Sequence, residues 1–388
     1  MGGGLLQLVA YGAQDVYLTG NPQITFFKAV YRRHTNFAIE AIQQTFNGTP
    51  GFGQRVTTTV ARNGDLINRV YLALDINNLN GSVCPYFGLR LINYVEIEIG
   101  GQKIDKQYSH WMYIWNELSL PKSKKDGYDD MVGGAGGVLT NKQLFVPLEF
   151  WFCRNVGLAL PLIALQYHEV KINLNFETKE KCEGDATNDP ITGSFAASLW
   201  VDYIFLDTDE RRRFAQLSHE YLIEQLQFTG EEAVTSNMKS KLNFNHPCKE
   251  LIWFISQKGD NTKWMNYTTS NDMAEDRVTS VNKIATAKLV LNGNDRFAER
   301  NGSYFNMVQP FQHHENIPSN AGINVYSFAL KPEEHQPSGT LNMSRIDTAT
   351  LNLTPYTGDY ANDSLNVYAV NYNVLRIMSG MGGIAYSN

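Results

Sequence analysis

The sequence predicts an all-β fold of two tandem eight-stranded antiparallel jelly rolls, a double jelly roll, with short helices in the loops. Three observations support this prediction. Short sequence motifs from the first half recur in the same order in the second half. Apolar residues alternate over short segments, and clusters of Gly, Asn, Asp and Pro separate those segments. Short alternating segments between turn signals are typical of antiparallel sandwiches. A repeated order of phrases indicates a duplicated domain.

Five pairs of similar sequence motifs indicate the duplication. The pairs are Phe37–Gly48 with Tyr221–Gly230, Val70–Leu74 with Leu251–Ile255, Ile97–Ile104 with Leu289–Arg296, Lys171–Asn175 with Thr350–Thr354, and Tyr203–Leu206 with Tyr372–Leu375. Their separations range from 169 to 192 residues, so the offset drifts only as far as loops of different length allow. A chain of 388 residues is also long for one core, whereas two domains of about 180–190 residues fit the usual size.

Each half has room for about eight strands, the number with which a jelly roll pairs most of its edges in two packed sheets. The alternating segments of the first half are 55–60, 95–99, 170–176 and 199–205. Those of the second half are 241–244, 287–291, 324–330, 349–353 and 365–370. Helical periodicity is rare, and Tyr108–Leu118 and Arg211–Gln216 are the two predicted helices.

These elements predict an N-terminal arm at 1–24, a first roll at 25–208, a linker at 209–220 and a second roll at 221–388. Within the first roll, Phe26–His34 is either a short helix or the entry into the first strand. The apolar residues of the arm have no partners in so short a segment, so we expect them to dock on the domains or on a neighbouring subunit. Four long loops are predicted at 122–140, 179–193, 259–276 and 316–322.

Composition argues against a protein that grips nucleic acid. The net charge is −6, and each basic run is followed or preceded by acidic residues, as in Lys122–Asp130 and Asp207–Arg213. Nucleic-acid binding needs clustered Lys and Arg. The four cysteines, at 84, 153, 182 and 248, form no CxxC motif, so we expect a reducing compartment and neither a zinc site nor a disulfide scaffold. No signal peptide and no apolar span are expected, so the product is expected to be soluble and cytosolic when made.

Three local patterns that could carry chemistry are read as structural. Gly133–Gly137 lacks the Lys-Ser/Thr of a phosphate loop, so it is predicted to be a flexible loop. His313-His314-Glu315 could bind a metal but is predicted to be exposed and polar. His168-Glu169 is predicted to make an interior or interface contact rather than to catalyse. We therefore predict no catalytic residue, no metal site and no cofactor.

Two further groups of residues are candidates for surface function. Asn-x-Ser/Thr sites occur at Asn47, Asn80, Asn266, Asn301, Asn342, Asn352 and Asn362. Asn80, Asn266, Asn301 and Asn362 fall in loop-like sequence and are the predicted glycosylation sites. The aromatic groups around Trp111–Trp115 and Phe150–Phe152 are predicted to lie in the core or a subunit interface, with a sugar-binding surface as the alternative.

The chain resembles the major capsid proteins of large icosahedral double-stranded DNA viruses, and most of all those of the algal-virus (phycodnavirus) branch. Blocks in order along nearly the whole chain carry this resemblance. They are Leu8–Phe27, Tyr31–Arg33, Asn36–Glu40, Gly157–Glu169, Val201–Asp207, Leu242–Pro247, Gln336–Gly339, Ser344–Asp347 and Asn371–Gly380. The second repeat looks shorter than is usual in that family, a difference that lies in the loops.

The resemblance implies a structural coat protein of the virion that trimerises into pseudo-hexagonal capsomers and tiles an icosahedral shell. The implied partners are copies of itself, minor capsid and penton proteins, and proteins of an internal viral membrane, with covalent glycans on outer loops and no direct binding of nucleic acid. Two related domains and a threefold axis give six similar sides without help from the family. The alternative is a tandem jelly-roll carbohydrate-binding protein or hydrolase, which would be a monomer with a concave aromatic or carboxylate-lined site.

Overall fold

The structure is a computed structural model that describes residues 3–139, 143–185, 187–269, 281–356 and 362–387. It divides into two units, Met1–Asn36 and Phe37–Asn388. The first unit contains helices α1 (Gly3–Val9) and α2 (Val16–Thr19), neither of which buries a residue. Residues 26–34 form neither helix nor strand and precede β1. The domain limits that we predicted stay a prediction.

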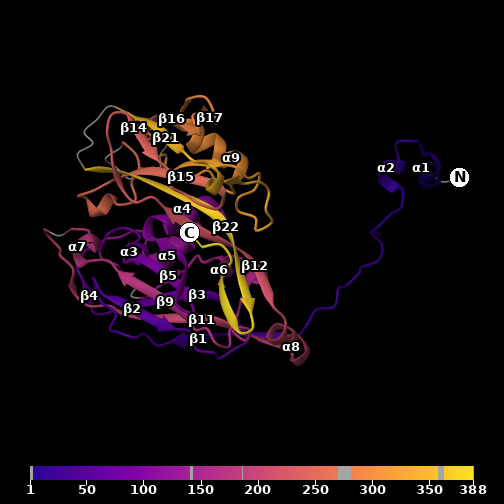
Figure 1. The fold of residues 1–388 in the computed structure, drawn as a ribbon, viewed down its shortest axis with the longest axis horizontal. Helices are drawn as coiled ribbons and strands as arrows, with labels where there is room; N and C mark the ends of the chain where they lie inside the picture. The colour runs from indigo at the N-terminus through magenta and orange to yellow at the C-terminus, as the bar shows by residue number, and fades with distance from the viewer. Residues whose placement is uncertain (1–2, 140–142, 186, 270–280, 357–361, 388) are drawn as a thin grey trace. The chain divides into compact units, whose positions relative to one another are not determined.

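The first half of the compact unit contains two antiparallel sheets of four principal strands (Figure 1). The order of one sheet is β1-β11-β3-β7 and that of the other is β2-β9-β5-β6. Their bounds are β1 (Phe37–Gln44), β2 (Arg55–Thr59), β3 (Leu66–Asp75), β5 (Ile92–Ile99), β6 (Gln102–Tyr108), β7 (Gln143–Pro147), β9 (Val170–Phe176) and β11 (Ala196–Leu206). Eight strands in two such sheets form a jelly roll.

The second half repeats this arrangement strand for strand. One sheet has the order β12-β22-β15-β19 and the other β14-β21-β16-β17. Their bounds are β12 (His219–Phe228), β14 (Met238–Lys241), β15 (Pro247–Gln257), β16 (Ile284–Leu291), β17 (Asn294–Asp295), β19 (Asn324–Ser327), β21 (Ala349–Pro355) and β22 (Asp363–Met378). The predicted double jelly roll is confirmed. All five pairs of repeated sequence motifs fall on strands at equivalent sheet positions.

Short elements decorate both rolls. The extra strands are β4 (Leu79–Asn80), β8 (Leu160–Pro161), β10 (Thr192–Gly193), β13 (Glu232–Ala233), β18 (Arg300–Asn301), β20 (Leu341–Asn342) and β23 (Met381–Ile384). The helices are α3 (Phe87–Arg90), α4 (Ser109–Ser119), α5 (Lys122–Val132), α6 (Trp151–Arg154), α7 (Lys179–Cys182), α8 (Thr208–Gln216) and α9 (Gln309–His313), with single turns η1 (Val156–Leu158), η2 (Asn261–Lys263), η3 (Tyr304–Val308) and η4 (Met343–Arg345).

The strands form because alternate side chains can be buried. In β21, Ala349, Leu351 and Leu353 are buried while the residues between them are half exposed. In contrast, β15 is buried almost continuously from Cys248 to Ser256. The reason is that its sheet is covered on both sides. Leu251 and Trp253 belong to the core of the second roll, whereas Ile252 and Phe254 belong to a core shared with the first roll.

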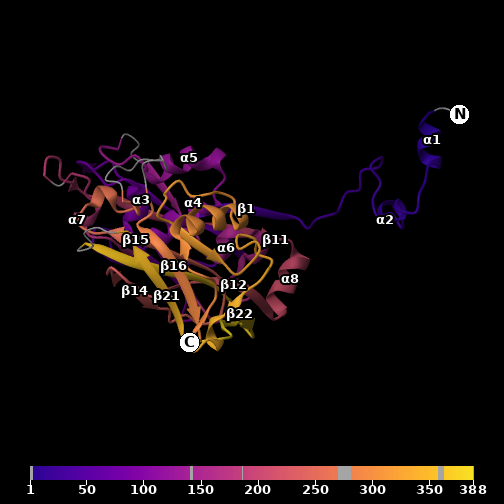
Figure 2. The ribbon, with the colours of Figure 1, turned by 90° about the horizontal axis from the view of Figure 1, so that it is seen from above.

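The helix predictions were partly right. Helix α4 confirms the predicted helix at Tyr108–Leu118, and α8 covers the second predicted helix and lies beside β11 and β12 (Figure 2). The loop predicted at 122–140 is wrong in its first part, because α5 begins after Pro121 and ends at a left-handed Gly133. The strand predicted at 241–244 is also displaced, since β14 ends at Lys241. Part of the loop predicted at 259–276 lies outside the described residues.

Candidate functional site

Within the compact unit, the two rolls share a hydrophobic core. One face of the β12-β22-β15-β19 sheet packs on α4 and β6 of the first roll, and α4 lies between the rolls in Figure 1. The ring of Tyr368 lies 5.9 Å from Trp111 on α4 and 4.8 Å from Phe228 on β12. The buried Trp264 donates its ring N–H to the Pro85 carbonyl at 2.7 Å. These aromatic contacts fix one roll against the other.

A buried histidine at this contact is held neutral. The ring of His110 on α4 packs 5.3 Å from Phe254, and its Nδ1 lies 2.8 Å from the Tyr267 hydroxyl. Burial lowers the pKa of His110 to about 3, with smaller contributions from Arg90 and Lys181. The neutral imidazole therefore acts as a packing and hydrogen-bonding group between the rolls.

A second contact between the rolls is an ion pair, and further buried charges of the second roll lie beside it. Arg154 of the first roll pairs with Glu224 at 3.0 Å, and Lys249, whose side chain is fully buried, pairs with the same carboxylate at 2.8 Å. His314 lies 3.1 Å from Glu250 and 2.8 Å from Glu333. Burial alone would lower the pKa of His314, but the two carboxylates raise it to about 9. Charges of opposite sign are thus paired through the interior.

The histidine patterns are therefore structural, but one was placed wrongly from the sequence. His314 was predicted to be exposed, and its side chain is fully buried between two carboxylates. His168, which was predicted with Glu169 to make an interior or interface contact, is half-buried, and its Nδ1 lies 2.8 Å from the carbonyl oxygen of Gly382. Among the described residues, no group of three or more His, Cys, Asp or Glu could hold a metal ion. The four cysteines are free.

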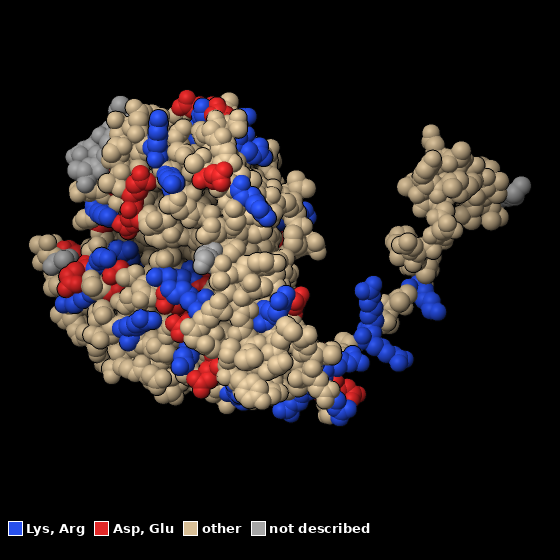
Figure 3. Space-filling model, in the orientation of Figure 1, with Lys and Arg blue, Asp and Glu red and all other residues tan. Residues whose placement is uncertain are grey.

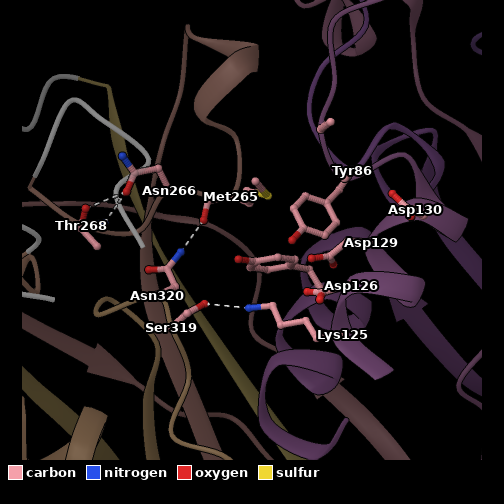
Figure 4. A pocket seen from close by; sticks show the side chains of 13 residues that line it. Tyr86, Lys125, Asp126, Asp129, Asp130, Met265, Asn266, Thr268, Ser319 and Asn320 are labelled. Atoms are coloured by element: carbon pink, nitrogen blue, oxygen red, sulfur yellow. Dashed lines mark hydrogen bonds between the residues drawn. The ribbon is translucent and has the colours of Figure 1, made fainter. Parts of the chain in front are cut away.

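A cavity of about 410 Å³ lies where α5 faces loops of the second roll (Figure 4). Asp126, Asp129 and Asp130 line one side, and Asn266, Ser319 and Asn320 line the other. Lys125 donates to the Ser319 hydroxyl at 3.1 Å and pairs with Glu117 at 2.9 Å. Asn320 donates to the Met265 carbonyl at 2.6 Å. The polar groups across this cavity tie α5 to the second roll.

The four predicted glycosylation sites differ in exposure. Asn80 on β4, Asn301 on β18 and Asn362 just before β22 are exposed. Asn266 is not, because it is only 5% exposed and its Oδ1 accepts hydrogen bonds from the backbone N–H and the hydroxyl of Thr268. The prediction that Asn266 lies on an outward loop is therefore wrong. The aromatic residues Trp111–Trp115 and Phe150–Phe152 are confirmed as core.

Charge is spread over the compact unit in pairs. On the face shown in Figure 3, Lys and Arg are interspersed with Asp and Glu. Arg211 of the predicted linker pairs with Asp65 at 2.9 Å, and Lys288 pairs with Asp295 at 2.6 Å. Interspersed charges do not make the basic stripe on which a phosphate backbone binds. Among the described residues, no helix is long and apolar enough to cross a membrane.

The folded chain exposes two apolar surfaces that the sequence did not indicate. One lies on the β1-β11-β3-β7 sheet, where Ile39 is 52% exposed. The other lies on η3 and α9, where Phe311 is 75% exposed. The alternation of β1 indicates two faces but not which face stays uncovered, and the five-residue helix α9 is too short for a helical period. Only the folded arrangement separates these residues from the core.

Comparison with known proteins shows the family. Residues 25–207 match the family model described as major capsid protein N-terminus, and residues 210–383 match that described as large eukaryotic DNA virus major capsid protein. The chain belongs to the major capsid proteins of large eukaryotic DNA viruses. It is 55% identical to the major capsid protein of Pyramimonas orientalis virus and 47% identical to that of Paramecium bursaria Chlorella virus 1, in each case over 100% of both chains. The predicted resemblance to the algal-virus branch is confirmed.

Solved structures support the same assignment. A quasi-atomic model of the Paramecium bursaria Chlorella virus 1 capsid matches with a TM-score of 0.82 and 44% identity, covering 94% of this chain and 100% of that one. The Faustovirus major capsid protein shares the fold, with a TM-score of 0.78 at 14% identity, covering 95% and 94%. The chain is therefore a structural component of an icosahedral virion that self-associates into the capsomers of the shell. The family is not an enzyme family, and the carbohydrate-binding or hydrolase alternative is not supported.

Proposed function

We propose that three copies of this chain form a closed homotrimer whose six jelly rolls make a pseudo-hexagonal capsomer. The observation that carries this proposal is the identical strand order of the two rolls in one chain. Two similar rolls repeated by a threefold axis give six similar sides, and cyclic closure satisfies every lateral contact. Because a sheet of one roll is buried against the other roll, the two rolls form one rigid unit rather than two domains joined by a flexible linker.

The oligomer is tested by multi-angle light scattering on the purified full-length chain. The expected mass is three times the chain mass of 43.8 kDa. Obligate assemblies bury upwards of about 2,000 Å², so a trimer of this class is expected to be the main species at the concentration of the measurement. A particle with the mass of one chain, or of two, contradicts the proposal.

The other proteins that contact the trimer follow from the geometry of the shell. Trimers tile beside neighbouring trimers, and minor capsid and penton proteins fill the seams and vertices over an internal viral membrane. The N-terminal arm, whose α1 and α2 bury no residue, supplies apolar side chains such as Leu8 and Tyr17 for such contacts. The chain is made in the host cytoplasm, and Asn80, Asn301 and Asn362 carry glycans because their side chains are exposed.

A further inference from the structure

A small cavity lies between the two rolls of the chain. Its volume is about 10 Å³, and residues of β6, α4 and α6 from the first roll and of β12 and β22 from the second roll line it. A cavity needs about 10–15 Å³ to hold one water molecule. The space therefore suits a single water molecule and is too small for a larger ligand.

Three of the residues that line this cavity carry a buried polar atom without a partner. The atoms are Trp111 Nε1, Arg154 Nε and Gln107 Oε1, and none of them has a hydrogen-bond partner among the described residues. Trp111 and Gln107 are only 1% and 2% exposed, so bulk solvent does not reach these groups. Buried polar atoms are nearly always hydrogen-bonded, to protein or to ordered water. Three unpaired atoms around one cavity therefore indicate a shared partner inside it.

The amide of Gln107 is fixed with its oxygen as the unpaired atom. Its Nε2 donates to the backbone carbonyl oxygen of Glu149 at 2.7 Å and to Asp105 Oδ2 at 3.1 Å. Exchanging the amide oxygen and nitrogen would place an oxygen against two acceptors. The unpaired set is therefore two N–H donors, from Trp111 and Arg154, and one oxygen acceptor from Gln107.

Two donors and one acceptor match the hydrogen-bonding capacity of a water molecule. The water oxygen accepts from the N–H groups of Trp111 and Arg154, and one water hydrogen donates to Gln107 Oε1. Asp105 and Glu149 also line the cavity and supply carboxylate oxygens for the second hydrogen. Buried waters make about three hydrogen bonds on average, so the groups present meet the usual requirement.

An ion fits the same groups less well. A cation would meet the N–H hydrogens of Trp111 and Arg154, which are donors only. A chloride ion would accept from those donors, but the Gln107 oxygen and the carboxyl groups of Asp105 and Glu149 line the same space. Only a neutral molecule that both donates and accepts satisfies every group.

We propose that one water molecule binds in this cavity and bridges Trp111, Gln107 and Arg154. The guanidinium group of Arg154 pairs with Glu224 of the second roll at 3.0 Å. By holding Nε of the same guanidinium group, the water positions Arg154 for the ion pair that joins the rolls. All of these groups belong to one chain, so the site does not depend on the proposed trimer.

The first test is a crystallographic map of the wild-type chain at a resolution that shows ordered water. One peak is expected at about 2.7–3.2 Å from Trp111 Nε1, Arg154 Nε and Gln107 Oε1. A second crystal grown with bromide in place of chloride distinguishes an anion, because bromide scatters anomalously and water does not. A map without the peak, or an anomalous peak at this position, overturns the proposal.

The second test observes the indole N–H of Trp111 directly. The difference between the ultraviolet resonance Raman spectra of the wild type and Trp111→Phe isolates this indole, and the N–H bending band shifts when the N–H is hydrogen-bonded. Trp253→Phe is the matched control, because Trp253 is also fully buried with an Nε1 that has no partner among the described residues, but it does not line this cavity. Circular dichroism verifies that both variants are folded.

The band of Trp111 is expected at the hydrogen-bonded position and that of Trp253 at the unbonded position. A Trp111 band at the unbonded position overturns the proposal. The outcomes also separate this site from the trimer. A monomeric chain with the water peak refutes the trimer and supports the water site, whereas a trimer without the peak does the reverse.

Discussion

The buried charges around His314 predict a stability that falls as pH rises. The side chain lies between Glu250 and Glu333 with no exposed surface, and its pKa of about 9 stands above the ordinary value of 6.5. A group whose pKa is raised by folding stabilises the folded state fully below its unfolded pKa. That contribution is lost as pH passes through the folded pKa.

The size of the effect follows from the shift. Each pKa unit corresponds to about 1.4 kcal/mol, so a rise from 6.5 to about 9 corresponds to about 3 kcal/mol of unfolding free energy. Glu250 remains ionised across this window, because His314 and Lys249 together hold its pKa below the ordinary value although burial acts to raise it. The titrating group between these pH values is therefore the imidazolium.

The assay is urea unfolding of the wild type and His314→Gln, followed by tryptophan fluorescence. Near pH 6 the variant is expected to be less stable by about 3 kcal/mol, since a buried carboxylate loses its partner. Near pH 10 the two proteins are expected to differ by less than about 1 kcal/mol. His34→Gln, on the exposed arm, is the control and should change nothing. A difference between wild type and His314→Gln that stays constant with pH would refute the reasoning.

Three further predictions concern packing, backbone and modification. Tyr368→Ala removes a ring with 1% exposure that contacts Trp111, Phe228 and Phe254. Thermal and chemical unfolding should therefore show a loss of about 3–5 kcal/mol in the free energy of unfolding. A loss below about 1 kcal/mol would mean that the rolls do not rely on this contact. Gly193→Ala is expected to destabilise by more than about 1 kcal/mol, because φ is +86° and an added Cβ would lie 1.9 Å from the Asn78 carbonyl oxygen. Gly127→Ala in α5, where a Cβ meets nothing within 4 Å, should instead stabilise by about 0.5–1 kcal/mol, and equal effects of the two changes would contradict this account. Mass spectrometry of chain purified from virions should find glycan on peptides with Asn80, Asn301 or Asn362 and none on Asn266, and a glycan at Asn266 would contradict its burial.

The sequence predicted the strands that have one covered face and missed features that depend on distant partners. The alternation of apolar residues over 170–176 predicted β9, because successive side chains of a strand point to opposite faces of the sheet. Leu242 and Phe244 alternate too, and both are buried, yet they follow the end of β14. Alternating apolar residues indicate burial, whereas strand assignment needs a partner in the ladder. The sequence alone does not supply that partner.

Helix α5 and His314 escaped prediction for related reasons. Helix α5 is rich in Lys and Asp and buries only Tyr128 and Val132, so it lacks the apolar stripe by which a helix is recognised. His314 is buried by carboxylates from β15 and from the connection after β19, which no local motif links to it. Asn266 was assigned to the surface because turn-forming neighbours are usually exposed, and the packing of the two rolls overrides that tendency.

The most direct measurement is a cryo-electron-microscopy map of the assembled particle at a resolution that separates strands. The account predicts threefold capsomers with six roll-shaped densities, two from each chain. A capsomer built from any other number of chains would contradict the proposed assembly.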